Sequence, residues 1–122
     1  MFNDFKCNCP IYLAQGFTDL RLGIDGLATI VEREFKLEPC QAALFLFCGR
    51  RADRIKGLYW EGDGFLLLYK RLESGKFRWP RKVKECAKIT SQQYRWLMEG
   101  LNIVQPKCTQ KINNIKFTQK SA

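Results

Sequence analysis

The segment that decides the fold spans residues 42–80 and reads AALFLFCGRRADRIKGLYWEGDGFLLLYKRLESGKFRWP. It begins with a continuous apolar run over residues 42–48, which has the length of a strand buried on both faces. Glycine-containing turns then divide further aromatic-rich runs at residues 55–60, 65–72 and 77–79. Short apolar runs divided by such turns are typical of an antiparallel meander, so this segment predicts an antiparallel sheet. In the last run the alternation of side chains predicts Phe77 and Trp79 on one side of the chain and their basic neighbours on the other.

Helical patterns flank this segment. A short strand is expected at residues 11–13, followed by an N-cap at Thr18. Apolar residues then recur at three- and four-residue steps, which predicts a helix that ends before Pro39. These residues are Leu20, Ile24, Leu27, Val31 and Phe35. Near the other end, Thr90 and Gln93 form a capping-box pattern that predicts a shorter helix. Its expected apolar face consists of Tyr94, Leu97, Met98 and Leu101, and Gly100 is placed to end it.

The expected fold class is therefore α+β: an antiparallel sheet of about four or five strands, with one long N-terminal helix and a short C-terminal helix. A single domain is expected over residues 11–106, because 122 residues supply apolar groups for one core. Residues 1–10 are expected to form a flexible lead-in, and the basic residues 81–88 a linker or mobile loop. The basic tail at residues 107–122 is expected to be disordered until a partner binds.

Charge is distributed unevenly along the chain. The 21 Lys and Arg residues exceed the 12 Asp and Glu residues, which gives a formal net charge of +9. Residues 1–48 have a net charge of −2, residues 49–95 a net charge of +8 and residues 96–122 a net charge of +3. A concentrated excess of this kind indicates a polyanionic partner, most often nucleic acid and less often an anionic membrane surface.

Several classes of protein are excluded by composition. The sequence contains no histidine, which rules out a histidine general base, a Ser-His-Asp or Cys-His nucleophile and any histidine-containing metal site. The longest apolar runs, at residues 42–48 and 65–69, are far shorter than the ~18 residues of a membrane span. The chain opens without the basic and apolar regions of a signal peptide, so a cytoplasmic location and no membrane partner are expected.

Six cysteines leave three alternatives. Three disulfides are the first, but the sequence shows no signal peptide and Cys48 lies inside an apolar strand-like run, which argues against them. A four-thiolate zinc site is conceivable from the Cys7 and Cys9 pair together with the scattered Cys40, Cys48, Cys86 and Cys108. Structural zinc sites normally use tighter paired spacing, and the chain has no CxxC pair. Reduced cysteines, some buried as small apolar residues, are therefore the expectation, with no metal and no cofactor.

The candidate contact residues for a polyanion lie in the arginine-rich connection after residue 48 and along the runs that follow. They are Arg50, Arg51, Arg54, Lys56, Lys70, Arg71, Lys76 and Arg78. A guanidinium group suits this role because it binds a phosphate through two parallel hydrogen bonds. The alternative is a solvated positive face that is partly neutralised by Asp53, Glu61 and Glu73, but these acidic partners are few.

Two further groups of residues offer chemistry for binding or catalysis. Six aromatic residues offer surfaces for base stacking, although core packing is their more common use. They are Tyr59, Trp60, Phe65, Tyr69, Phe77 and Trp79. Five carboxylates offer ligands for a magnesium-dependent nuclease, although no pair has a specific spacing. They are Asp19, Asp25, Asp53, Glu61 and Asp63, and no catalytic residue is assigned.

Four stretches of the chain resemble a known family. They are TDLRLGIDGL at residues 18–27, LFLFCGRRADRIK at residues 44–56, WEGDG at residues 60–64 and YKRLESGKFRWP at residues 69–80. In this order they resemble the TnpB accessory proteins of insertion sequences of the IS66 type, which are unrelated to the RNA-guided nucleases that share the TnpB name. The resemblance covers about residues 11–106.

The resemblance implies a small bacterial protein that is encoded beside a separate Asp-Asp-Glu transposase and assists transposition, with no established catalytic residues to carry over. We therefore expect a non-catalytic accessory protein that binds transposon ends or a transposase–DNA complex through the basic residues above. The alternatives are an adaptor for the transposase without affinity for DNA and, third, a metal-dependent nuclease. A homodimer is a further expectation, because a small sheet leaves an unpaired edge strand.

Overall fold

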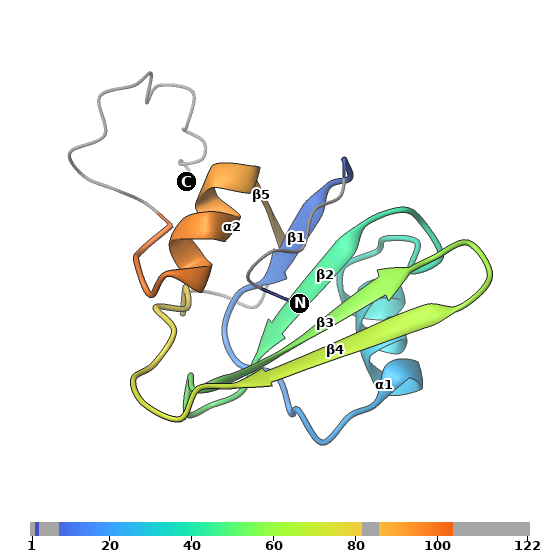
Figure 1. The fold of residues 1–122 in the computed structure, drawn as a ribbon. Coiled ribbons are helices and arrows are strands. Elements are labelled where there is room, and N and C mark those ends of the chain that lie inside the picture. The colour runs from blue at the N-terminus through green and yellow to red at the C-terminus, as the bar shows by residue number, and fades with distance from the viewer. Residues whose placement is uncertain (1, 3–7, 82–85, 104–122) are drawn as a thin grey trace.

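The computed structural model describes Phe2, residues 8–81 and residues 86–103. Within this part, five strands form one sheet in the order β4-β3-β2-β1-β5. The strands are β1 (Ile11–Ala14), β2 (Leu44–Cys48), β3 (Arg54–Trp60), β4 (Phe65–Arg71) and β5 (Cys86–Ile89). The helices are α1 (Ile24–Thr29), which continues as a π-helical turn over Ile30–Glu34, and α2 (Ser91–Met98). Figure 1 shows this arrangement. The tail expected at residues 107–122, and all of the expected lead-in before Asn8 except Phe2, lie outside the described residues.

The sheet is mixed, so the prediction of an antiparallel sheet is wrong. Strands β2, β3 and β4 form an antiparallel meander that contains two of the three runs expected in it. Strand β1, however, pairs with β2 in parallel, with Ile11 opposite Leu44 and Leu13 opposite Leu46. A parallel pair requires a long crossover connection. Residues 15–43 provide it, because they carry α1 across one face of the sheet before β2 begins. The apolar pattern of a short strand is the same in either direction, so the sequence contained no signal for this difference.

The fifth strand also differs from expectation. Part of the predicted basic linker, from Cys86 onward, forms β5, which pairs antiparallel with β1 at the opposite edge of the sheet from β4. Conversely, residues 77–79 lie outside every strand. The predicted alternation within them is nevertheless confirmed, because Phe77 and Trp79 are 4% and 5% exposed while Lys76 and Arg78 face solvent.

The predicted long N-terminal helix is also wrong. Helix α1 begins only at Ile24, with Gly23 rather than Thr18 at its N-cap. The backbone N–H of Thr18 donates instead to the carbonyl of Cys48 (2.8 Å), which ties this part of the chain to the end of β2. Leu20 packs against the same core cluster as the helical residues, although it precedes the helix. A turn that folds back onto one face of the sheet can therefore imitate helical spacing.

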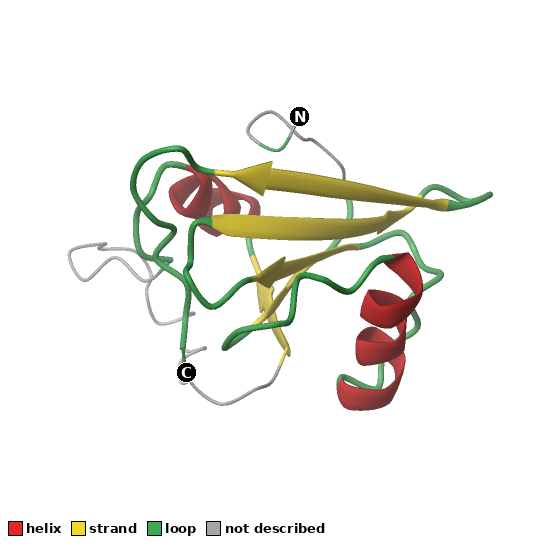
Figure 2. Ribbon diagram, turned by 90° about the horizontal axis from the view of Figure 1, so that it is seen from below, coloured by secondary structure: helices red, strands yellow, loops and turns green. Residues whose placement is uncertain are grey.

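The core lies on both faces of the sheet. Every residue of β2 is buried, as predicted for its continuous apolar run. On one face, which we call the α1 face, Phe45 and Phe47 pack against Leu27 and Val31 of the helical segment. On the other, the α2 face, Leu44, Leu46 and Cys48 join a cluster supplied by α2 and the loop after β4. Figure 2 shows the two helices on opposite sides of the sheet.

Helix α2 begins as predicted. The Thr90 hydroxyl accepts a hydrogen bond from the N–H of Gln93 (3.0 Å), and the Gln93 side chain accepts one from the N–H of Thr90 (2.8 Å), which completes the capping box. Tyr94 and Leu97 are buried against the α2 face. The helix ends at Met98, before Gly100 with its positive φ, so Leu101 lies beyond the helix and is 42% exposed rather than part of its apolar face.

Phe2 completes the cover of the α2 face. Its side chain is buried against Gly57 of β3, where a Cβ atom would lie only 2.8 Å from the Phe2 ring. The hydroxyl of Tyr94 donates a hydrogen bond to the backbone carbonyl of Phe2. Glycine at position 57 thus makes room for an aromatic ring that comes from the other end of the sequence.

Trp79 allows a test of the α2 face. Its indole Nε1–H donates to the carbonyl of Ala14 (2.8 Å), which links the loop after β4 to the end of β1. We expect Trp79→Phe to lower the free energy of unfolding by about 2 kcal/mol, because it removes volume and leaves a buried carbonyl without its partner. Urea denaturation measures the change. The control is Trp96→Phe on α2, where the indole is only half-buried; a loss of the same size for both variants would contradict the role given to this hydrogen bond.

Candidate nucleic-acid interface

Two basic segments that are separate in the sequence meet at one end of the sheet. This is the end at which β2 stops, β3 starts and β4 stops, at the lower left of Figure 1. The turn at residues 49–53 and the loop at residues 72–81 are joined there by two backbone hydrogen bonds. Leu72 N–H donates to the Asp53 carbonyl and Phe77 N–H to the Ala52 carbonyl, each at 2.7 Å. We call this region the basic end.

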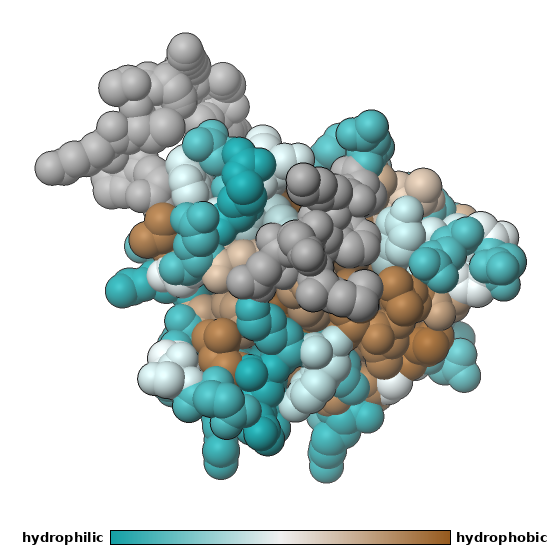
Figure 3. All heavy atoms as spheres, viewed as in Figure 1, coloured by the Kyte–Doolittle hydropathy of each residue, from teal (hydrophilic) through white to brown (hydrophobic). Residues whose placement is uncertain are grey.

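Six of the eight predicted contact residues belong to the basic end. Arg50 and Arg51 lie in the turn after β2, and Arg54 and Arg71 are opposite each other where β3 begins and β4 ends. Lys76 and Arg78 lie in the loop after β4. In Figure 3 hydrophilic side chains gather at the lower left of the view, over this end. Tertiary structure therefore brings these six residues together.

Two of the six have carboxylate partners. Arg54 Nε lies 3.2 Å from an oxygen of Asp53, and Arg71 donates twice to Glu73 at 3.1 and 3.0 Å. The hydrogen bonds to Glu73 raise the pKa of Arg71 above its ordinary value, so the guanidinium remains charged. The Arg71–Glu73 pair is exposed, and such pairs contribute about 0–1 kcal/mol, so a phosphate can replace Glu73 at little cost. The Arg54–Asp53 pair is partly buried.

The other four are not neutralised in this way. Arg50, Arg51, Lys76 and Arg78 are exposed and form no ion pair with any other described residue. Glu61, which the sequence offered as a neutralising partner, lies in the β3–β4 turn at the opposite end of the sheet. The positive potential of the basic end is therefore largely uncompensated within the described part of the chain.

Lys56 and Lys70 lie on opposite faces of the sheet, so the eight predicted residues do not share one face. Lys56 is opposite Tyr69 on the α1 face, whereas Lys70, one residue further along β4, points to the α2 face. The Lys56 ammonium donates to the carbonyl of Leu22 (3.0 Å) and lies 5.8 Å from the centre of the Tyr69 ring. Lys56 thus connects the sheet to the chain before α1.

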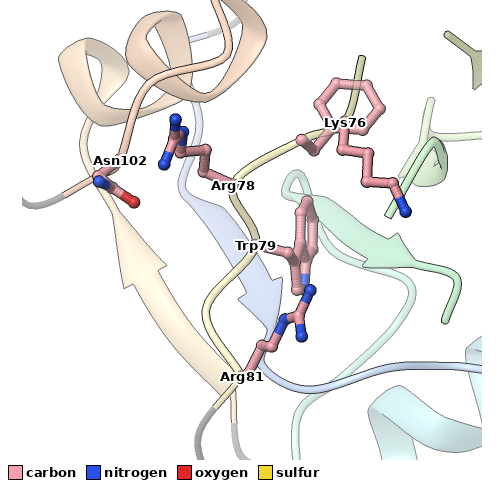
Figure 4. Close-up of a pocket in the computed structure, with 6 residues that line it drawn as sticks. Lys76, Arg78, Trp79, Arg81 and Asn102 are labelled. Atoms are coloured by element: carbon pink, nitrogen blue, oxygen red, sulfur yellow. The ribbon is translucent and has the colours of Figure 1, made fainter. Parts of the chain in front are cut away.

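A shallow groove extends the basic end along the loop after β4. It has a volume of about 400 Å³ and is lined by Lys76, Phe77, Arg78, Trp79, Arg81 and Asn102. Figure 4 shows Arg78 directed toward Asn102 and the Arg81 guanidinium beside the Trp79 indole. Arg81 also lies over the ring of Phe17, at 5.1 Å from its centre. Arg81 was not among the eight predicted contact residues, although it begins the basic segment at residues 81–88 that extends them along the chain.

The carboxylates weighed for metal-dependent catalysis do not form a metal site. No three His, Cys, Asp or Glu residues of the described chain lie close enough together to hold a metal ion. Asp19 instead binds Arg21, and these hydrogen bonds lower the pKa of Asp19 to about 2. Asp53 is paired with Arg54.

The cysteines differ in state. Cys40, Cys48 and Cys86 are free thiols, but Cys9 is disulfide-bonded, so the expectation of reduced cysteines is wrong for Cys9. Burial raises the pKa of Cys48 and of Cys86 to about 12. Both therefore remain protonated at neutral pH and are poor nucleophiles.

Tyr69, for which the sequence favoured packing in the core, lies on the surface. Of the six aromatic residues weighed for stacking, Tyr69 is 53% exposed, while Phe77 and Trp79 are buried. The only sequence signal for the exposure of Tyr69 was its spacing of two from Arg71, which places both side chains on the same face of β4.

No helix in the described ranges has the length and apolarity needed to cross a membrane.

These features define a small protein with a mixed sheet, one helix on each face and a cationic end. The chain belongs to the family of IS66 Orf2-like proteins, whose sequence profile matches residues 9–108, and the resemblance seen in the sequence is thereby confirmed. Membership of this family supports an accessory role in the transposition of an insertion sequence.

Two relatives from Sinorhizobium fredii illustrate the similarity. The uncharacterized protein y4hO is 34% identical over 102 residues, which cover 84% of this chain and 89% of y4hO. The uncharacterized protein y4jC is 33% identical over 92 residues, which cover 75% of this chain and 79% of y4jC. No solved structure matches the chain significantly.

The structural role of Lys56 leads to a prediction. Lys56→Met removes a charged donor and leaves the Leu22 carbonyl without that hydrogen bond. We expect the free energy of unfolding to fall by about 1 kcal/mol, as measured by urea denaturation. The control is Lys76→Met at an exposed position that forms no ion pair with a described residue, where the change should stay within about 0.5 kcal/mol. Equal effects for the two variants would argue against a structural role for Lys56.

Proposed function

We propose that the accessory role of this chain in transposition is non-catalytic and consists of binding DNA, at transposon ends or in a transposase–DNA complex, through the basic end. The observation that carries the proposal is the meeting of six predicted basic residues at one end of the sheet, four of them without an ion pair in the described chain. The separately encoded transposase is the proposed protein partner. In this proposal the transposase carries out the reaction on the DNA and this chain only binds that DNA, so this chain requires no active site.

Electrostatics supports DNA as the polyanion. Arginine provides five of the six groups, and its fork of donors fits a phosphate better than a point charge does. The groove beside Arg78 and Arg81 adds a recess in which a phosphate can lie close to cationic side chains. If all six residues contact phosphates, the logarithm of the binding constant should fall with the logarithm of salt concentration with a slope of about −5.

A charge-matched pair of variants tests the assignment. Arg50→Gln with Arg51→Gln removes two charges from the basic end, and Arg33→Gln with Lys36→Gln removes two exposed charges from the acidic first 48 residues. We expect the first pair to weaken duplex binding and to reduce the salt slope by about 2, because two counterion-releasing contacts are lost. The second pair should leave both quantities unchanged. Fluorescence anisotropy with a labelled duplex at several salt concentrations measures them.

The same titrations separate the alternatives. If both variant pairs weaken binding equally, only net charge matters and the basic end is not a site. If the unaltered protein binds no duplex at low salt but co-purifies with the transposase after nuclease treatment, it is an adaptor without intrinsic DNA affinity. Magnesium-dependent cleavage of the labelled duplex that is lost in Asp53→Asn would instead support a nuclease.

A further inference from the structure

Tyr69 forms a separate feature beside the basic end. Among the described residues, only Tyr69 and Leu101 are large apolar side chains with substantial exposure, and only Tyr69 is aromatic. An aromatic ring that stays exposed within a strand does not gain the free energy of apolar burial that stabilises its buried neighbours. The side chains that surround the ring indicate which kind of ligand this surface suits.

The register of β3 and β4 sets three cations around Tyr69. Lys56 is directly opposite Tyr69, and Arg54 is directly opposite Arg71. Residues that are opposite each other, or two apart along a strand, lie on the same face of a sheet. Tyr69, Lys56, Arg54 and Arg71 therefore form a four-residue patch on the α1 face. Lys56 is held over the ring by its hydrogen bond to the Leu22 carbonyl, which fixes one side of the patch.

We infer that Tyr69 is a stacking surface for an unpaired base, and that this patch binds single-stranded DNA, with Arg54 and Arg71, which are opposite each other on one side of Tyr69, contacting the phosphates next to the stacked base. The inference rests on the proposed function, which it deepens by naming the form of DNA. An intact duplex buries the faces of its bases within the stack, so only unpaired or frayed DNA presents a base to a flat surface of this kind. The ion pair of Arg71 with Glu73 is exposed and exchanges readily for phosphate. The pair of Arg54 with Asp53 is partly buried and leaves the rest of the guanidinium to bind a phosphate.

Two substitutions at position 69 distinguish a contribution of base stacking to DNA binding from contributions of charge or of altered folding. Tyr69→Leu keeps an apolar residue in the strand but removes the π surface, and Tyr69→Phe keeps the ring. We expect Tyr69→Leu to weaken binding of a labelled oligo-dT by about tenfold, the size of one lost base stack. Tyr69→Phe should bind oligo-dT as the unaltered protein does, and both variants should bind a duplex of equal length with unchanged affinity.

An oligonucleotide with abasic sites provides an independent readout, because it keeps the phosphates and removes the bases. The unaltered protein should bind it about as weakly as Tyr69→Leu binds oligo-dT, and Tyr69→Leu should show no further loss. Circular dichroism and urea denaturation confirm that each variant is folded before its binding is compared.

The outcomes distinguish this inference from the proposed function. Normal duplex binding, with no effect of Tyr69→Leu on oligo-dT, would overturn stacking at Tyr69 and leave DNA binding through the basic end in place. An equal loss of duplex and oligo-dT binding in Tyr69→Leu would also overturn it, because the effect would not depend on unpaired bases. Failure of the unaltered protein to bind either DNA would overturn both proposals.

Discussion

The structure depends on the complete burial of strand β2. All five of its residues are buried, with at most 2% of any residue exposed, so both faces of the sheet must be covered at this position. The α1 segment covers one face, and α2, Phe2 and the loop after β4 cover the other. This requirement explains why the chain crosses from β1 to β2 through a helix and why Trp79 is anchored to the carbonyl of Ala14.

The same requirement accounts for the position of the basic end. Charged groups are costly to bury, so a sheet covered on both faces leaves its cations mainly to strand ends and connecting loops. The turn after β2 and the loop after β4 both lie at the same end, because β2 and β4 run in the same direction on either side of β3. Arginines and lysines that are more than twenty residues apart in the sequence thus contribute to one surface.

Much of the fold was predictable where the signal was local. The strand predicted within residues 42–48, the runs of the meander at residues 55–60 and 65–72, the capping box at Thr90 and the alternation at Phe77 and Trp79 each depend on neighbouring residues, and each was confirmed. The last run of the predicted meander, at residues 77–79, is not a strand. The errors concern relations between distant segments. Strand β1 gave no indication of its parallel partner, and the apolar spacing around Leu20 came from a turn that packs beside a helix rather than from the helix itself. Of the candidate site, composition located the basic segments but not the faces on which Lys56 and Lys70 lie.

The sequence by itself determined the uneven charge, the absence of histidine, the buried central strand and membership of the IS66 Orf2-like family. These follow from composition and short motifs, which do not depend on how the chain is arranged in space. Only the tertiary structure decided that six of the predicted cations meet, that Lys56 is held by the Leu22 carbonyl, and that Tyr69 is exposed beside Arg54 and Arg71. The physical reason is that strand register and the cover of each face set which side chains are neighbours and which meet water, and both are properties of the whole fold.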